Sequence, residues 1–107
     1  MFEPKEQSRA QQLMGDFAPK LAELTDDILF GDVWAREGLS QRDRSLITVA
    51  ALVANGNTDQ LPGHLNRARA NGISEAELSE VMTHLAFYAG WPRAISAILV
   101  AKEVFKK

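Results

Sequence analysis

The sequence predicts an all-α fold. Two observations support this prediction: apolar residues recur at three-and-four spacing along much of the chain, and glycine and proline fall between the periodic segments. No stretch alternates apolar and polar residues for long, as a half-buried strand would. The chain has 107 residues. This length suits one hydrophobic core and is too short for two, so we expect a single domain over residues 1–107.

The first two expected helices are apolar along one side only. The first runs from about Pro4 to Phe17 and is mostly polar. The second begins at Pro19, because proline suits the first turn of a helix. Residues 31–38 show no clear period and are expected to be irregular. The apolar stripe of the second helix consists of Leu21, Leu24, Ile28 and Leu29.

The third expected helix has the clearest start and end. Ser40 is placed to cap its N-terminus, Asp43 suits its first turn, and Gly56 ends it. Residues 46–54 are apolar except for Thr48, so this helix is apolar on every side. A short chain has few elements to cover such a helix, and we therefore expect a subunit interface.

Three further helices complete the predicted fold. The fourth spans about residues 58–71 and ends at Gly72. The fifth begins with a capping box at Ser74 and ends at Gly90, and the sixth opens at Trp91. The residues of the sixth helix that we expect to be buried are Ile95, Ile98, Leu99, Ala101 and Val104.

Composition excludes several classes of function. The 12 Lys and Arg residues against 14 Asp and Glu give a net charge of −2, without the basic excess typical of phosphate-binding nucleic-acid proteins. No apolar run reaches the ~18 residues that span a bilayer, and the N-terminus lacks the apolar core of a secretory signal. The chain has no cysteine, which excludes disulfides, thiol nucleophiles and cysteine-ligated metals. We expect a cytoplasmic protein that binds neither nucleic acid nor membranes.

The two histidines are the first candidates for chemistry. His64 and His84 lie at similar distances on either side of Gly72, so an antiparallel helix pair would place them at the same height. His64 shares a stripe with Leu61 and Leu65 and is expected to face inward or into a pocket. From these residues alone, a structural histidine is favoured over a catalytic one. Two histidines without close acidic partners are a weak ligand set, so no metal site is expected.

Arginines around the third helix are the second candidates. Arg44 lies just before the apolar stretch and is expected to be partly enclosed. An enclosed guanidinium needs an anionic partner, either an internal carboxylate such as Glu37 or Asp43 or a bound carboxylate. We expect the other arginines of the third and fourth helices to be solvated, and these are Arg42, Arg67 and Arg69.

Three segments resemble the carboxymuconolactone decarboxylase family. They are residues 39–52 (LSQRDRSLITVAAL), 59–68 (DQLPGHLNRA) and 83–94 (THLAFYAGWPRA). The likeness covers about residues 30–104, and the spacing between the segments also fits. The resemblance implies an alkylhydroperoxidase-D-like helical subunit that assembles into a ring, commonly a hexamer built as a trimer of dimers.

The resemblance also indicates which branch of the family applies. Peroxidase-type members carry a glutamate, a CxxC pair and a histidine at positions that match Ser45, Asn57, Gln60 and His64. Only the histidine is present here. Without thiols the peroxide-reducing cycle has no electron source, so we expect no cysteine-based peroxidase activity.

The decarboxylase branch implies a reaction that needs no cofactor. It converts 4-carboxymuconolactone, or a closely related small unsaturated lactone or acid, to the β-ketoadipate enol-lactone in aromatic-acid catabolism. Electrons from the lost carboxylate pass through the adjacent double bond into the lactone carbonyl. The protein therefore has to supply a cation for the retained carboxylate, a donor for the oxyanion, a proton source and a dry slot.

We assign these roles as hypotheses. His64 is the general acid or oxyanion donor, Arg44 anchors the retained carboxylate of a small anionic substrate, and Asn57 and Gln60 hydrogen-bond the lactone. Arg42 or Arg36 assists Arg44 in binding the carboxylate. The expected pocket walls, contributed in part across a subunit interface, are His84, Tyr88 and Trp34. Two alternatives stay open: a paralogue with a different unsaturated acid as substrate, and a non-enzymatic oligomer with structural histidines.

Overall fold

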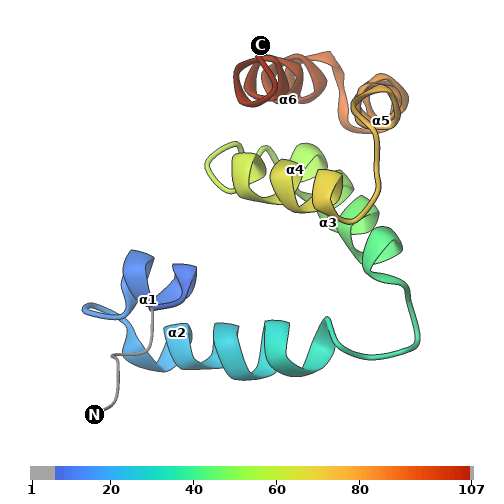
Figure 1. The fold of residues 1–107 in the computed structure, drawn as a ribbon. Coiled ribbons are helices and arrows are strands. Elements are labelled where there is room, and N and C mark those ends of the chain that lie inside the picture. Colours follow the sequence, from blue (N-terminus) through green and yellow to red (C-terminus); the bar gives the residue numbers. More distant parts are fainter. Residues whose placement is uncertain (1–6, 107) are drawn as a thin grey trace. The chain divides into compact units, whose positions relative to one another are not determined.

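The structure, a computed structural model, describes residues 7–106 (Figure 1). Every regular element in this range is helical, which confirms the all-α prediction. The chain divides into two compact units, with the boundary between Gly38 and Leu39. The elements are α1 (Arg9–Met14), α2 (Pro19–Leu24), the π-helix η1 (Thr25–Val33), α3 (Gln41–Asn55), α4 (Leu61–Ala70), α5 (Glu75–Ala89) and α6 (Trp91–Val104).

The N-terminal unit contains α1, α2 and η1. Ser8 caps α1, because its Oγ accepts a hydrogen bond from the Gln11 amide at 3.0 Å and donates one to Asp26 Oδ2 at 2.7 Å. The second bond ties η1 to the start of α1. The expected first helix is longer than α1, and its start at Pro4 lies outside the described residues.

The second helix begins at Pro19 as predicted and continues directly into η1. The expectation of irregular structure is therefore wrong for residues 31–33. A π-helix has more residues per turn than an α-helix, which moves later side chains away from a common stripe. The expected apolar stripe is not buried within this unit, and its exposed members are Leu21, Leu24, Ile28 and Leu29.

The C-terminal unit contains α3 to α6, and local sequence signals set the ends of its helices. Ser40 Oγ accepts from the Asp43 amide at 3.0 Å, and the capping box at Ser74 is present. Gly56 ends α3 with φ of 71°, a left-handed conformation that favours glycine. These three predicted boundaries are confirmed.

The core of this unit lies where α3 meets α4 and where α5 and α6 pack over them. Both α4 and α5 pack against α3 and α6. The fully buried large residues come from three helices and from the α4–α5 connection, and they are Val49, Val53, Leu61, Leu65, Ile73, Leu78 and Met82.

The expected antiparallel pairing of the fourth and fifth helices is wrong. Figure 1 shows α5 nearly end-on while α4 lies across the view, and α3 and α6 are the packing partners of both helices. Ile73, in the short connection between the two helices, is completely buried in the core. After this residue, α5 packs against α3 and α6. His64 and His84 are therefore not brought to the same height on facing helices.

The buried side of α6 also differs from the prediction. Ile95, Ile98 and Leu99 are 49%, 37% and 61% exposed, whereas Ala94 and Ala97 are buried. Alanine allows α6 to approach the core closely, and this contact turns the large apolar residues outward. The expected Ala101 and Val104 are half-buried at the edge of the core.

The helix predicted to be apolar on every side is only partly covered. Val49 and Val53 of α3 are buried, but Ile47 is 55% exposed. None of the described helices combines the length and the apolar content needed to cross a bilayer.

Candidate active site

A polar contact fixes how α3 and α4 lie against each other. Asn71 Nδ2, at the end of α4, donates to Ser45 Oγ in the first turns of α3 at 2.9 Å. Ser45 is fully buried. Because the end of one helix meets the start of the other, α3 and α4 run in opposite directions.

This contact defines a strip that we call the α3–α4 seam, made up of Arg44, Ser45, Thr48, His64, Arg67 and Asn71. On α4, His64 and Arg67 precede Asn71 by two turns and one turn and lie on the same side of the helix. On α3, Thr48 follows Ser45 by nearly one turn, and its Oγ1 donates to the Arg44 carbonyl oxygen at 2.7 Å. The hydrogen bond joins Asn71 to Ser45, and helical spacing places His64 on the Asn71 side of α4 and Arg44 next to Ser45 on α3.

Both predicted catalytic residues are partly buried. His64 and Arg44 are half-buried, and the atoms His64 Nδ1 and Arg44 Nε are inaccessible to solvent. Burial lowers the pKa of His64 below its ordinary value of 6.5, and the positive charge of Arg67 lowers it further. The lowered pKa favours the neutral imidazole at neutral pH, and this form has one N–H donor and one acceptor nitrogen.

Asn57 and Gln60 lie in the connection between α3 and α4. Gln60 is the N-cap residue of α4, one turn before His64, and both amide residues are exposed. Arg93 of α6 reaches this connection, since its Nη1 is 2.9 Å from the point that a Cβ on Gly56 would occupy. Arg93 was not among the predicted residues, because only the packing of α6 brings it to this connection.

Two other predicted residues, Arg42 and His84, lie in a different groove, between α3 and α5. Arg42 forms an ion pair with Glu77, and the ring of His84 lies against Tyr88 with centroids 4.9 Å apart. Arg42 is on the other side of α3 from Arg44, as the helical spacing of these two residues requires. This groove has a volume of about 520 Å³ and is lined by Arg42, Leu46, Ile47, Ala50, Glu77, Glu80, Val81, His84 and Leu85.

Trp34 belongs to the N-terminal unit. It is buried there, and its ring lies 5.7 Å from that of Phe30, centroid to centroid. This packing accounts for its position in that unit, and its expected role as a wall of the pocket stays a prediction.

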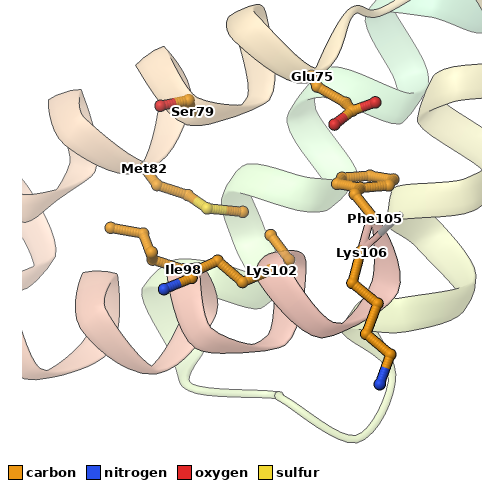
Figure 2. Close-up of a pocket in the computed structure, with 8 residues that line it drawn as sticks. Glu75, Ser79, Met82, Ile98, Lys102, Phe105 and Lys106 are labelled. Atoms are coloured by element: carbon orange, nitrogen blue, oxygen red, sulfur yellow. The ribbon is translucent and has the colours of Figure 1, made fainter.

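A further cavity of about 540 Å³ lies between α5 and α6 (Figure 2). Its walls are apolar at Met82, Ile98 and Phe105, and Figure 2 shows Glu75 above the Phe105 ring. Lys106 at its edge pairs with Glu103 at 3.1 Å. None of the predicted site residues lines this cavity.

The arrangement on the α3–α4 seam suits a carboxylate ligand better than a metal ion. Guanidinium groups such as that of Arg44 bind carboxylates in a fixed, two-pronged geometry. A neutral imidazole beside them donates a hydrogen bond to an oxygen that is gaining negative charge. Within residues 7–106, no three His, Asp or Glu side chains gather closely enough to hold a metal ion.

Comparisons with known proteins point to one family. The model of the carboxymuconolactone decarboxylase family matches residues 19–103. The chain is 37% identical over 102 residues to a 4-carboxymuconolactone decarboxylase from Acinetobacter baylyi, which covers 95% of this chain and 76% of that protein.

Two further relatives are more distant. A nitrosuccinic acid decarboxylase from Metarhizium robertsii is 35% identical over 81 residues, which covers 76% of this chain and 57% of that protein. An uncharacterised 15.0 kDa protein from Paracoccus denitrificans is 26% identical over 106 residues, which covers 97% of this chain and 79% of that protein.

Proposed function

Because this chain belongs to the carboxymuconolactone decarboxylase family, we propose that it is a cofactor-free carboxy-lyase. Its substrate is 4-carboxymuconolactone or a closely related small unsaturated lactone or carboxylic acid. The product of the former is the β-ketoadipate enol-lactone, in the catabolism of aromatic acids. The observation that carries this proposal is the half-buried, neutral His64 on a seam that also carries Arg44 and Arg67.

The proposed reaction uses the substrate as its own electron sink. The bond between the ring carbon and the departing carboxylate breaks, and its electron pair moves through the double bond onto the lactone carbonyl oxygen. Carbon dioxide leaves, and the resulting dienolate takes up one proton from water at the α-carbon. Arg44 binds the retained carboxylate, and the amide groups of Asn57 and Gln60 hydrogen-bond the lactone.

The lowered pKa of His64 supports one of the two roles that the sequence left open. A general acid needs an imidazolium, which is scarce at neutral pH when the pKa lies below 6.5. A neutral imidazole donates an N–H hydrogen bond to the oxyanion without first having to gain a proton. We therefore assign His64 primarily as the oxyanion donor.

The names of the two decarboxylase relatives fit this chemistry. One acts on a lactone acid and the other on a nitro-substituted acid. A lactone carbonyl and a nitro group both accept an electron pair onto oxygen. A donor to that oxygen is a requirement that the two reactions would share.

The proposed assembly is a homo-oligomeric ring, a hexamer built as a trimer of dimers. Its support is the number of large apolar side chains on the surface of α5 and α6, including Phe87, Trp91 and Leu99. In such a ring a second copy contributes Arg42, His84 and Tyr88 as pocket walls. A cytoplasmic location, without nucleic-acid or membrane partners, also stays a prediction.

Bicarbonate release from purified protein tests the function. Incubation with 4-carboxymuconolactone and a panel of related unsaturated acids should give turnover with at least one of them. Replacing His64 with alanine should lower kcat at least ~100-fold, as expected for loss of an oxyanion donor. The matched control is Asn66→Ala, an exposed position on the same helix, which should retain the original rate.

Two results would decide against this assignment. Unchanged turnover in His64→Ala would remove His64 from the mechanism. No bicarbonate from any acid offered would favour the alternative, a non-enzymatic paralogue whose histidines are structural. Neither outcome restores a thiol peroxidase, because the chain has no cysteine.

A further inference from the structure

We propose that Arg67 is a second cationic group of the active site and that it stabilises the negative charge developing on the substrate oxygen beside His64. This inference rests on the proposed function and deepens it. It assigns a role to a residue that the sequence placed among the solvated arginines.

The position of Arg67 on α4 supports this role. Arg67 follows His64 by three residues, so the two side chains are neighbours on one side of the helix. The next arginine, Arg69, lies on the opposite side and donates its Nη1 to the Ile73 carbonyl oxygen at 3.2 Å. Two arginines that look alike in the sequence therefore have different surroundings.

Arg67 is exposed, and helical spacing places it on the same side of α4 as His64 and Asn71. Asn71, one turn after Arg67, donates to the buried Ser45 of α3. The Asn71 backbone amide also donates to the Arg67 carbonyl oxygen at 2.9 Å, so this last turn of α4 is regular. Arg67 thus lies between the anchored end of the seam and His64.

Arginines are present on α4 and on the helices α3 and α6 that pack against it. Arg67 is on the same helix as His64, Arg44 is on α3, and Arg93 of α6 reaches the α3–α4 connection at Gly56. The acidic residue nearest in sequence, Asp59, is exposed in that connection. Burial and the charge of Arg67 act in the same direction on the pKa of His64 and lower it. A site with this field favours an anion and keeps the imidazole neutral.

Arg44 and Arg67 therefore affect different kinetic parameters of the reaction. Arg44 holds a carboxylate that is charged before and after the reaction, so its contribution is mainly to substrate binding. Arg67 acts on an oxygen that becomes negative only when the carbon–carbon bond breaks. Interactions that strengthen only in the transition state raise kcat rather than lower KM.

A matched set of arginine variants tests the proposed role of Arg67. Arg67→Gln should lower kcat at least ~10-fold with less than ~3-fold change in KM, as expected when a donor to a developing oxyanion is lost. Arg67→Lys should recover most of the lost rate, because it restores the charge. Arg69→Gln is the control, and it should keep both parameters within ~2-fold of the original protein.

Titration of the histidine rings by NMR adds a readout that a purely structural role would not change. Arg67→Gln should raise the pKa of His64, because a positive neighbour is removed, whereas Arg69→Gln should leave it where it is. His64→Gln identifies the resonance.

The possible failures are distinguishable. Turnover by the original protein together with an unchanged kcat in Arg67→Gln, or with an effect confined to KM, would overturn this inference alone. An unshifted His64 titration in Arg67→Gln would also overturn it. No turnover by the original protein would overturn the proposed function and this inference with it.

Discussion

Partial burial determines what His64 contributes to folding as well as to chemistry. Its side chain is half-buried on the α3–α4 seam, and burial followed by the Arg67 charge lowers its pKa below 6.5. The folded state therefore binds a proton at this ring less readily than the unfolded chain does. Between the folded and unfolded pKa values the unfolded chain holds more protons, so the free energy of unfolding increases with pH in that interval.

This difference predicts how acid affects stability. Lowering the pH from 7.5 through 6.5 and below should reduce the free energy of unfolding of the original protein more than that of His64→Gln. Above 6.5 the ring is mainly neutral in both states, and its contribution to the pH dependence disappears. Urea unfolding at a series of pH values measures these slopes, and Asn66→Ala should follow the original protein. Parallel slopes for His64→Gln and the original protein would contradict the prediction.

Two glycines of α3 and α4 show how conformation and space determine the effect of one methyl group. Gly56 has a positive φ, and a Cβ there would lie 2.9 Å from Arg93 Nη1. Gly63 lies within α4, and no atom is within 4 Å of the position of its Cβ.

The same substitution should therefore have opposite effects at these two positions. Gly56→Ala should destabilise the protein by about 1–2 kcal/mol, because alanine is strained at this φ and Arg93 must move. Gly63→Ala should stabilise it by about 0.5–1 kcal/mol, because alanine favours the helix. Thermal unfolding of the two variants checks both signs. A stabilising effect of Gly56→Ala would show that neither the backbone nor Arg93 constrains this turn.

Helix boundaries in this chain were predictable because they depend on a few neighbouring residues. Ser40, Gly56 and the capping box at Ser74 act through bonds within one turn. The buried side of α6 was not predictable in this way. Its apolar residues lie on more than one side, and only the close approach of Ala94 and Ala97 to the core decides which side is buried.

For the candidate site residues, partial burial was predictable, whereas their roles stay a prediction. The family pattern identified His64 and the apolar stretch indicated Arg44, and both are partly buried on one seam. The grouping of these residues with Arg42 and His84 was not supported within one chain, because those two lie in the α3–α5 groove. Which side of a helix meets which neighbour depends on packing between elements. Arg67 is exposed, as expected from the sequence, and its relation to His64 comes from their spacing on α4.

At the scale of the whole molecule, α5 and α6 carry large apolar side chains that a single chain leaves exposed. Phe87 and Trp91 are 73% and 55% exposed, and their rings form an edge contact with centroids 5.0 Å apart. Ile95 and Leu99 continue this apolar surface along α6. Contiguous exposed apolar patches commonly mark contacts with other proteins.

The proposed oligomer should depend on this surface. Sedimentation should give a mass several times the 11.8 kDa of one chain. Ile95→Glu and Leu99→Glu should each shift the protein toward smaller species, because each places a charge in an apolar contact. Ser96→Glu, an exposed neighbour on a different side of α6, should retain the original mass. A monomeric original protein, or an unchanged mass in both α6 variants, would contradict this assignment.

The hydrogen bond between Asn71 and Ser45 restricts which side chains position 45 can hold. Position 45 matches the place where thiol-bearing members of the family have their acid, and here it is enclosed and joined to α4. Placing cysteines at positions 57 and 60 would leave that acid missing. A glutamate at position 45 would put a longer, charged side chain where the fully buried serine now accepts the Asn71 hydrogen bond, so the packing of α3 against α4 would have to adjust. Installing thiol chemistry on this scaffold therefore requires a new contact between two helices as well as new reactive groups.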